Sequence, residues 1–256
     1  MCVLVAAIDD HPDYDLVVAA NRDEFHDRPS AAAAPWHDAP HILAGRDLSA
    51  GGTWLGVDRA GRLAAVTNVR SNHSTPAVRS RGFLVSDFLN QAGPAAAYAE
   101  ALTLAAPLYA GVNLLAADRT SAVAWSNRAG RVLPLASGLF GLSNGALDDE
   151  WPKLAHLKQA CARARTLTGE DLIEALMSAL RDTAQPADAR LPETGVGLVR
   201  ERWLAPVFIV GEQYGTRCST IVLRSRTGEL MLIERRYAAD TRLTGESRHT
   251  LDVGRP

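Results

Sequence analysis

Short, almost continuous apolar runs recur along the chain, and turn-forming residues separate them. The first two, CVLVAAI (2–8) and DLVVAAN (15–21), flank the turn-rich segment DDHPDY. Runs of this length and character predict strands that are buried on both faces. A hairpin is expected over 51–70, and further strands over 111–118, 121–127, 138–144, 205–211, 218–225 and 228–237. Because short turns join most neighbouring runs, we expect antiparallel sheets.

Helical patterns interrupt the strands twice, over 81–91 and 94–106 and again over 148–165 and 168–180. Pro94 suits the first turn of a helix, and Thr168 with Asp171 resembles a capping pair. Each helix pair must cover the apolar face of a sheet, which predicts a layered α+β sandwich. The Ala/Pro-rich segment 30–40 is expected to be an exposed loop, too short to separate domains. We therefore expect residues 1–256 to form a single domain.

Composition excludes several classes of function. The formal net charge of −2 over 256 residues gives no overall attraction to nucleic acid or acidic lipid. No apolar run reaches the roughly 18 residues of a membrane span, and no basic, cleavable leader is recognisable. Cys2, Cys161 and Cys218 form no CxxC pair, so we expect a reducing, cytoplasmic location. His37 and His41 lack partners at metal-site spacing, so no metal site is expected.

Cys2 is the first candidate for chemistry. After removal of Met1, its own α-amine, with a pKa of about 7.7 to 8, can accept the thiol proton. Nucleophile and general base would then belong to one residue, and no catalytic histidine would be needed. The alternative is a small apolar residue at the start of a strand.

The sequence NRDE at 21–24 follows the second apolar run. If the first two strands are antiparallel neighbours, this run lies beside Cys2. Arg22 can then lower the thiol pKa or bind a carboxylate, and Asp23 can orient the α-amine. The alternative is a solvated strand end with an internal ion pair.

Three further polar residues stand at strand ends. Asn68 and Asn144 can donate to a developing oxyanion, although asparagine is also a common turn residue. Arg217, in YGTRCST, can bind a carboxylate or support the nucleophile; the alternative is a surface arginine.

Taken together, the motifs resemble those of the NRDE family, also called the transport and Golgi organisation two family. They are MC at the start, NRDE (21–24), GGTWLGV (51–57), TNVR (67–70), SRG followed by DFL (80–89), GVNLL (111–115), GLSN with LDDEWPK (141–153) and YGTRCST (214–220). The resemblance covers nearly the whole chain. It implies a four-layer αββα sandwich like that of N-terminal nucleophile hydrolases.

The resemblance also implies a set of site residues. Cys2 looks like the nucleophile of the cysteine branch, which includes penicillin and bile-salt amidases, and Arg22, Asp23, Asn68, Asn144 and Arg217 match its remaining positions. In those amidases two residues separate the arginine from the aspartate, whereas here they are adjacent. They would therefore point to opposite faces of a regular strand, unless the strand bulges.

Three hypotheses follow. The first is an amidohydrolase that cleaves an amide or thioester bond of a small acyl substrate without a cofactor, with Arg22 or Arg217 holding an acidic group. The second is a carrier for haem or an acyl ligand, since relatives are discussed in haem trafficking and acyl-CoA metabolism. Cys2 or a histidine would then ligate the iron. The third is a scaffold protein with a vestigial site.

Overall fold

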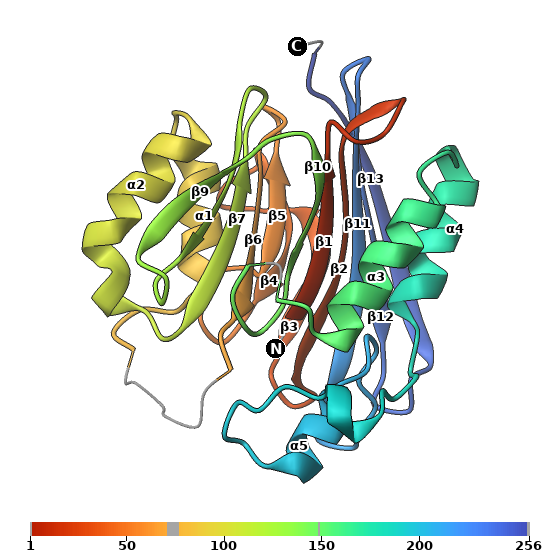
Figure 1. Ribbon diagram of the computed structural model, residues 1–256. Helices are drawn as coiled ribbons and strands as arrows, with labels where there is room; N and C mark the ends of the chain where they lie inside the picture. Colours follow the sequence, from red (N-terminus) through yellow and green to blue (C-terminus); the bar gives the residue numbers. More distant parts are fainter. Residues whose placement is uncertain (1, 71–76, 148, 255–256) are drawn as a thin grey trace.

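The computed structural model describes residues 2–70, 77–147 and 149–254, which form two antiparallel sheets (Figure 1). The first sheet has the strand order β10-β1-β2-β11-β12-β13, and the second β3-β4-β5-β6-β7-β8-β9. The strands of the first sheet are β1 (Cys2–Ile8), β2 (Tyr14–Phe25), β10 (Gly138–Leu142), β11 (Tyr214–Ser225), β12 (Glu229–Tyr237) and β13 (Leu243–Asp252). Those of the second are β3 (Ser30–Pro35), β4 (Ile42–Asp47), β5 (Leu55–Asp58), β6 (Leu63–Asn68), β7 (Val112–Ala117), β8 (Ala122–Ser126) and β9 (Arg131–Leu135).

Helices cover the outer face of each sheet. The helices α1 (Gly82–Asn90) and α2 (Ala95–Ala105) pack on the second sheet, and α3 (Pro152–Arg163) and α4 (Gly169–Leu180) pack on the first (Figure 1). A short helix, α5 (Leu198–Trp203), lies below the first sheet in Figure 1. The order of layers is helix, sheet, sheet, helix, which confirms the expected αββα sandwich.

Alternation along β1 explains why this strand is apolar throughout. Leu4 and Ala6 point into the core between the sheets, whereas Val3 and Val5 point toward α3 and α4. Both faces of a strand are buried when another layer covers each of them. Burying a valine or leucine side chain contributes about 1.5–3 kcal/mol, so the side chains on both faces of β1 stabilise the packing of layers on either side of it.

Two predictions of secondary structure were wrong, one for a loop and one for a strand. The segment 30–40, expected to be an exposed loop, contains the edge strand β3, which pairs with β4, and it buries Ala33 and Trp36. Proline is tolerated at an edge, so Pro35 can end this strand. The apolar run 205–211 is not a strand: Phe208 is buried in an irregular segment, where its N–H donates to the carbonyl of Asp182.

The capping prediction at Thr168 was also wrong. Thr168 is the N-cap residue of α4, but its side chain makes no capping hydrogen bond. The N–H of Gly169 instead donates to the hydroxyl of Tyr14, 3.3 Å away. Four further elements, β4, β9, α5 and β13, were not expected. In β13 exposed and half-buried residues alternate, so the sequence offers no apolar run.

Among the described residues, no helix is both long and apolar enough to cross a membrane.

Candidate active site

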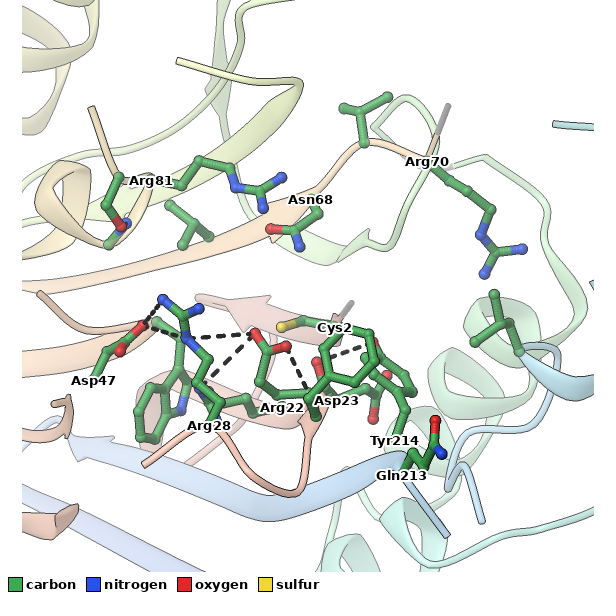
Figure 2. Close-up of a pocket in the computed structure, with 18 of the residues that line it drawn as sticks. Cys2, Arg22, Asp23, Arg28, Asp47, Asn68, Arg70, Arg81, Gln213 and Tyr214 are labelled. Atoms are coloured by element: carbon green, nitrogen blue, oxygen red, sulfur yellow. Dashed lines mark hydrogen bonds and ion pairs between the residues drawn. The ribbon is translucent and has the colours of Figure 1, made fainter. Parts of the chain in front are cut away.

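A cavity of about 740 Å³ opens where β1 begins and β2 continues past it (Figure 2). Cys2, Arg22 and Asp23 line it on the side of the first sheet, and Asn68, Arg70 and Arg81 lie on the facing wall. Its other lining residues are Glu24, Phe25, Arg28, Asp47, Thr53, Trp54, Val66, Val69, Ser80, Gly82, Val196, Arg200, Trp203, Leu204, Gln213 and Tyr214. The volume lies within the range of roughly 300–1,000 Å³ that is typical of small-molecule sites.

The register of β1 and β2 places Cys2 directly opposite Arg22. This confirms the expectation that the NRDE run lies beside Cys2. Residues paired across an antiparallel ladder share a face, so both side chains point toward the second sheet. Burial raises the pKa of the Cys2 thiol, and the Arg22 guanidinium and the backbone N–H of Asp23 oppose this rise by favouring the thiolate.

Arg22 is almost fully buried and lies over an aromatic ring. Its guanidinium carbon is 4.4 Å from the ring centroid of Trp54, a cation–π arrangement. Its Nη2 is 4.0 Å from the carboxylate of Glu24. Its Nη1 has no hydrogen-bond partner among the described residues. A buried guanidinium with an unused donor favours an anionic or carbonyl oxygen in the cavity.

Asp23 points to the other face of β2 and is buried there. The hydroxyl of Thr216 donates to its Oδ1 at 2.7 Å, and the hydroxyl of Tyr214 donates to its backbone carbonyl at 3.0 Å. Burial raises the pKa of the Asp23 carboxyl, whereas the charge of Lys153 and the Thr216 hydrogen bond oppose the rise. The carboxyl is therefore held in a fixed orientation near the start of β1.

A bulge in β2 was one way to bring Arg22 and Asp23 to the same face, but the irregularity lies on the neighbouring strand β11. Thr216 pairs with Asp23 and Cys218 pairs with Arg22, so Arg217 is the extra residue of β11. The pairing of β1 with β2 is regular, and Arg22 and Asp23 therefore do point to opposite faces. Both reach the cavity because it lies at the end of the strands.

The structure brings together four of the six predicted site residues: Cys2, Arg22, Asp23 and Asn68 line the cavity, and Asn144 and Arg217 do not. The side chain of Asn144 donates to the backbone carbonyl of Asn68 at 2.9 Å and accepts from Lys153 at 3.0 Å. Arg217 donates to the carbonyls of Phe25 and Arg28, at 2.7 and 3.2 Å. In this arrangement Asn144 and Arg217 hold the backbone that surrounds the cavity.

Lys153 is a site residue that the sequence reasoning missed. It does not line the cavity, but its buried ammonium group donates to Asn144 and, at 3.5 Å, to the carbonyl of the lining residue Leu204. Burial lowers the pKa of Lys153 to about 8, and the carboxylate of Asp23 opposes this change. One available signal was rarity, because Lys153 and Lys158 are the two lysines of the chain. The other was its place in the motif LDDEWPK.

Arg70, Arg81, Trp54 and Tyr214 were missed in the same way. Each belongs to one of the quoted motifs, TNVR, SRG, GGTWLGV and YGTRCST, and each lines the cavity. The motifs therefore converge on one place in the fold. Among the described residues, no group of three or more histidine, cysteine, aspartate or glutamate side chains is arranged to hold a metal ion.

Comparisons with known proteins agree with this geometry. The solved structure of a mutant of the conjugated bile acid hydrolase from Clostridium perfringens superposes with a TM-score of 0.55 at 8% identity, covering 100% of this chain and 95% of that one. At this identity the similarity shows a shared fold, that of N-terminal nucleophile hydrolases, and nothing about activity.

Sequence relatives define the family. The Transport and Golgi organization 2 homolog of Mus musculus is 33% identical over 255 residues, and its Homo sapiens counterpart 35% over 255 residues; each match covers 92% of both chains. The family model described as Transport and Golgi organisation 2 matches residues 1–239. The chain therefore belongs to the Transport and Golgi organisation 2 family.

Proposed function

We propose that this protein is an N-terminal cysteine hydrolase that cleaves an amide or thioester bond of a small acyl substrate. The observation that carries the proposal is the pairing of Cys2 with Arg22 at the opening of a cavity whose volume suits a small molecule. Asp23 and Asn68 line the same cavity, so candidates for orienting the base and for binding an oxyanion are present together.

Removal of Met1 is the first requirement, because it places a free α-amine on Cys2. This amine takes the thiol proton, and the thiolate attacks the acyl carbonyl carbon. The α-ammonium then gives the proton to the leaving amine or thiol, and a thioester to Cys2 remains. Water attacks this thioester, the amine again accepts a proton, and the free acid leaves with the thiol restored.

Two neighbours support these steps. Asp23 orients the α-amine through its buried carboxyl, which Thr216 fixes. The side chain of Asn68 donates to the tetrahedral oxyanion, and such a donor contributes roughly 2.7–4 kcal/mol to transition-state stabilisation in other acyl-transfer enzymes. Asn144 acts in this scheme by holding the backbone carbonyl of Asn68.

The proposal is tested by intact mass followed by a substrate screen. The mass of the untagged protein should be lower than that of the full chain by one methionine. Wild type should then hydrolyse some members of a panel of N-acyl amides and acyl thioesters. Cys2→Ala should reduce turnover to background, and Cys161→Ala, on helix α3, serves as the matched control. Retention of Met1, or full turnover by Cys2→Ala, would refute the mechanism.

The second candidate is a carrier that holds haem or an acyl ligand in the same cavity without turnover. Among the described lining residues, Cys2 and Tyr214 have side chains of types that ligate haem iron, Cys2 being the one at the cavity opening, and the cavity arginines can pair with propionates. The test is a haem titration of wild type and Cys2→Ser. A Soret shift in wild type that Cys2→Ser abolishes supports the carrier, and no shift in wild type argues against haem.

A further inference from the structure

The described cavity lining contains more arginines than carboxylates. Among the described lining residues, the arginines are Arg22, Arg28, Arg70, Arg81 and Arg200, and the carboxylates are Asp23, Glu24 and Asp47. Arg28 donates to Asp47 through Nε and Nη2, at 3.0 and 2.8 Å, so this pair is mutually neutralised. Arg70 pairs with Glu201 behind the cavity wall. Glu24 lies 4.0 Å from both Arg22 and Arg28, and Arg200 is exposed. Among the described lining residues, Arg81 is therefore the half-buried arginine without a carboxylate partner, and Arg22 keeps one unused donor.

Arg81 has weak protein contacts for a half-buried guanidinium. Its one hydrogen bond within the described chain runs from Nη1 to the carbonyl of Gly111, at 3.3 Å, and no carboxylate forms an ion pair with it. Burial lowers the pKa of Arg81, and the negative charges of a Cys2 thiolate and of Glu24 oppose this change. Figure 2 shows Arg81 and Asn68 extending from the wall opposite Cys2.

The backbone around Arg81 is held closely. A Cβ on Gly52 would lie 2.5 Å from the carbonyl carbon of Gly82, and a Cβ on Gly82 would lie 3.1 Å from the backbone of Thr53. These two glycines let the start of α1 pack directly on the segment before β5. Arg81, the residue that precedes α1, is thereby fixed at the cavity wall.

We propose that Arg22 and Arg81 form an anion-binding subsite on two sides of Cys2, so that the ligand carries a carboxylate or phosphate close to the bond that is attacked. Guanidinium groups bind both anions through paired N–H donors. Arg22 contributes the unused Nη1 donor and Arg81 an unneutralised charge. The existence of the anion subsite does not depend on the proposed hydrolase. The position of the anion close to the attacked bond rests on that proposed function, and it narrows the substrates to anionic acyl compounds.

Charge-selective alkylation of Cys2 tests the subsite without a known substrate. Iodoacetate and iodoacetamide are similar in size and attack thiols by the same displacement of iodide, but only iodoacetate is anionic. The rate constants for Cys2 are measured at one pH from the mass of its N-terminal peptide. The iodoacetate-to-iodoacetamide ratio is compared with that of β-mercaptoethanol, a neutral thiol. We expect the ratio to be about tenfold higher for Cys2, as steering by nearby charges predicts.

Variants and competitors locate the effect. Arg81→Gln should return the ratio close to that of β-mercaptoethanol, whereas Arg131→Gln, on the exposed part of β9, should leave it high. Phosphate and succinate are then compared as inhibitors of iodoacetamide labelling, and the one that protects at lower concentration identifies the preferred anion. A wild-type ratio no higher than that of β-mercaptoethanol, or an unchanged ratio in Arg81→Gln, would overturn the proposal.

The outcome is separable from that of the hydrolase test. A high, Arg81-dependent ratio in a protein that hydrolyses no acyl substrate would retain the anion subsite and remove the proposed reaction. If wild type hydrolysed neutral acyl substrates and Cys2 showed no preference for iodoacetate, the proposed reaction would stand and the anion subsite would be refuted.

Discussion

Replacing Glu201 with glutamine should destabilise the protein strongly, although the two side chains have almost the same shape. Arg70 and Glu201 form an ion pair in which each side chain is 4% exposed. The other carboxylate oxygen of Glu201 accepts from the N–H of Thr194 at 3.0 Å and from its hydroxyl. Glutamine can keep an oxygen for Thr194, but it removes the charge and puts an NH2 donor where Glu201 accepts from Arg70. Removing one partner of a buried ion pair costs about 3–5 kcal/mol.

The assay is urea unfolding at pH 7, with the free energy of unfolding extrapolated to water. Glu201→Gln should lower the free energy of unfolding by about 3 kcal/mol, the low end of this range, because the amide oxygen can still accept from Thr194. Asp188→Asn is the matched control, because Asp188 pairs with Arg202 of the same helix α5 and both side chains are about half exposed (50% and 47%). An exposed pair contributes less than about 1 kcal/mol.

The reasoning would be refuted if Glu201→Gln and Asp188→Asn lowered the free energy of unfolding by the same small amount. It would also fail if Arg70→Met and Glu201→Gln were additive, since residues in direct contact should be coupled. The pair matters for function as well. It ties α5 to the end of β6, and Arg200, Trp203 and Leu204 from this region line the cavity.

Three further predictions concern Asp118, at the end of β7 away from the cavity, and Lys153 and Gly52, which lie nearer to the site. Burial raises the pKa of Asp118, but hydrogen bonds from Ala95, Thr120 and Ser121 outweigh this and lower it to about 2. Asp118→Asn should therefore cost about 2 kcal/mol at pH 7, and urea unfolding should show this difference shrinking as pH falls from about 4 to 2; a constant difference would contradict it. Burial lowers the pKa of Lys153 to about 8, below the roughly 10.4 of an unfolded lysine, so the stability of wild type relative to Lys153→Met should rise between about pH 8 and 10. If the stability difference between wild type and Lys153→Met did not change with pH, Lys153 would not be desolvated. Gly52→Ala should cost about 1–3 kcal/mol in thermal unfolding and lower the iodoacetate preference of Cys2, because its Cβ would meet the Gly82 backbone at 2.5 Å. Unchanged stability would show that the close approach is absent.

The relation between Cys2 and the NRDE run was predictable from the sequence. Two apolar runs joined by a short turn form a local antiparallel pair, and their lengths bring the end of the second beside the start of the first. The alternation of strand and helix groups predicted a layered sandwich, and the family resemblance implied its αββα order. The segment 30–40 was misjudged because alanine and proline say little about whether an edge strand forms against a neighbour.

The rest of the site depends on contacts between distant parts of the chain. Asn144 meets Asn68 across 76 positions, Lys153 meets Leu204 across 51, and Arg81 lies on the cavity wall that faces Cys2. No local pattern reports such distances, because sheet-to-sheet packing decides them. The sequence by itself determined which residue types gather in motifs and how β1 pairs with β2. Only the tertiary structure decided which polar groups are already hydrogen-bonded, as Asn144 is, and which retain an unused donor, as Arg22 does. The physical reason is that burial and hydrogen bonding of a polar group depend on every layer packed around it.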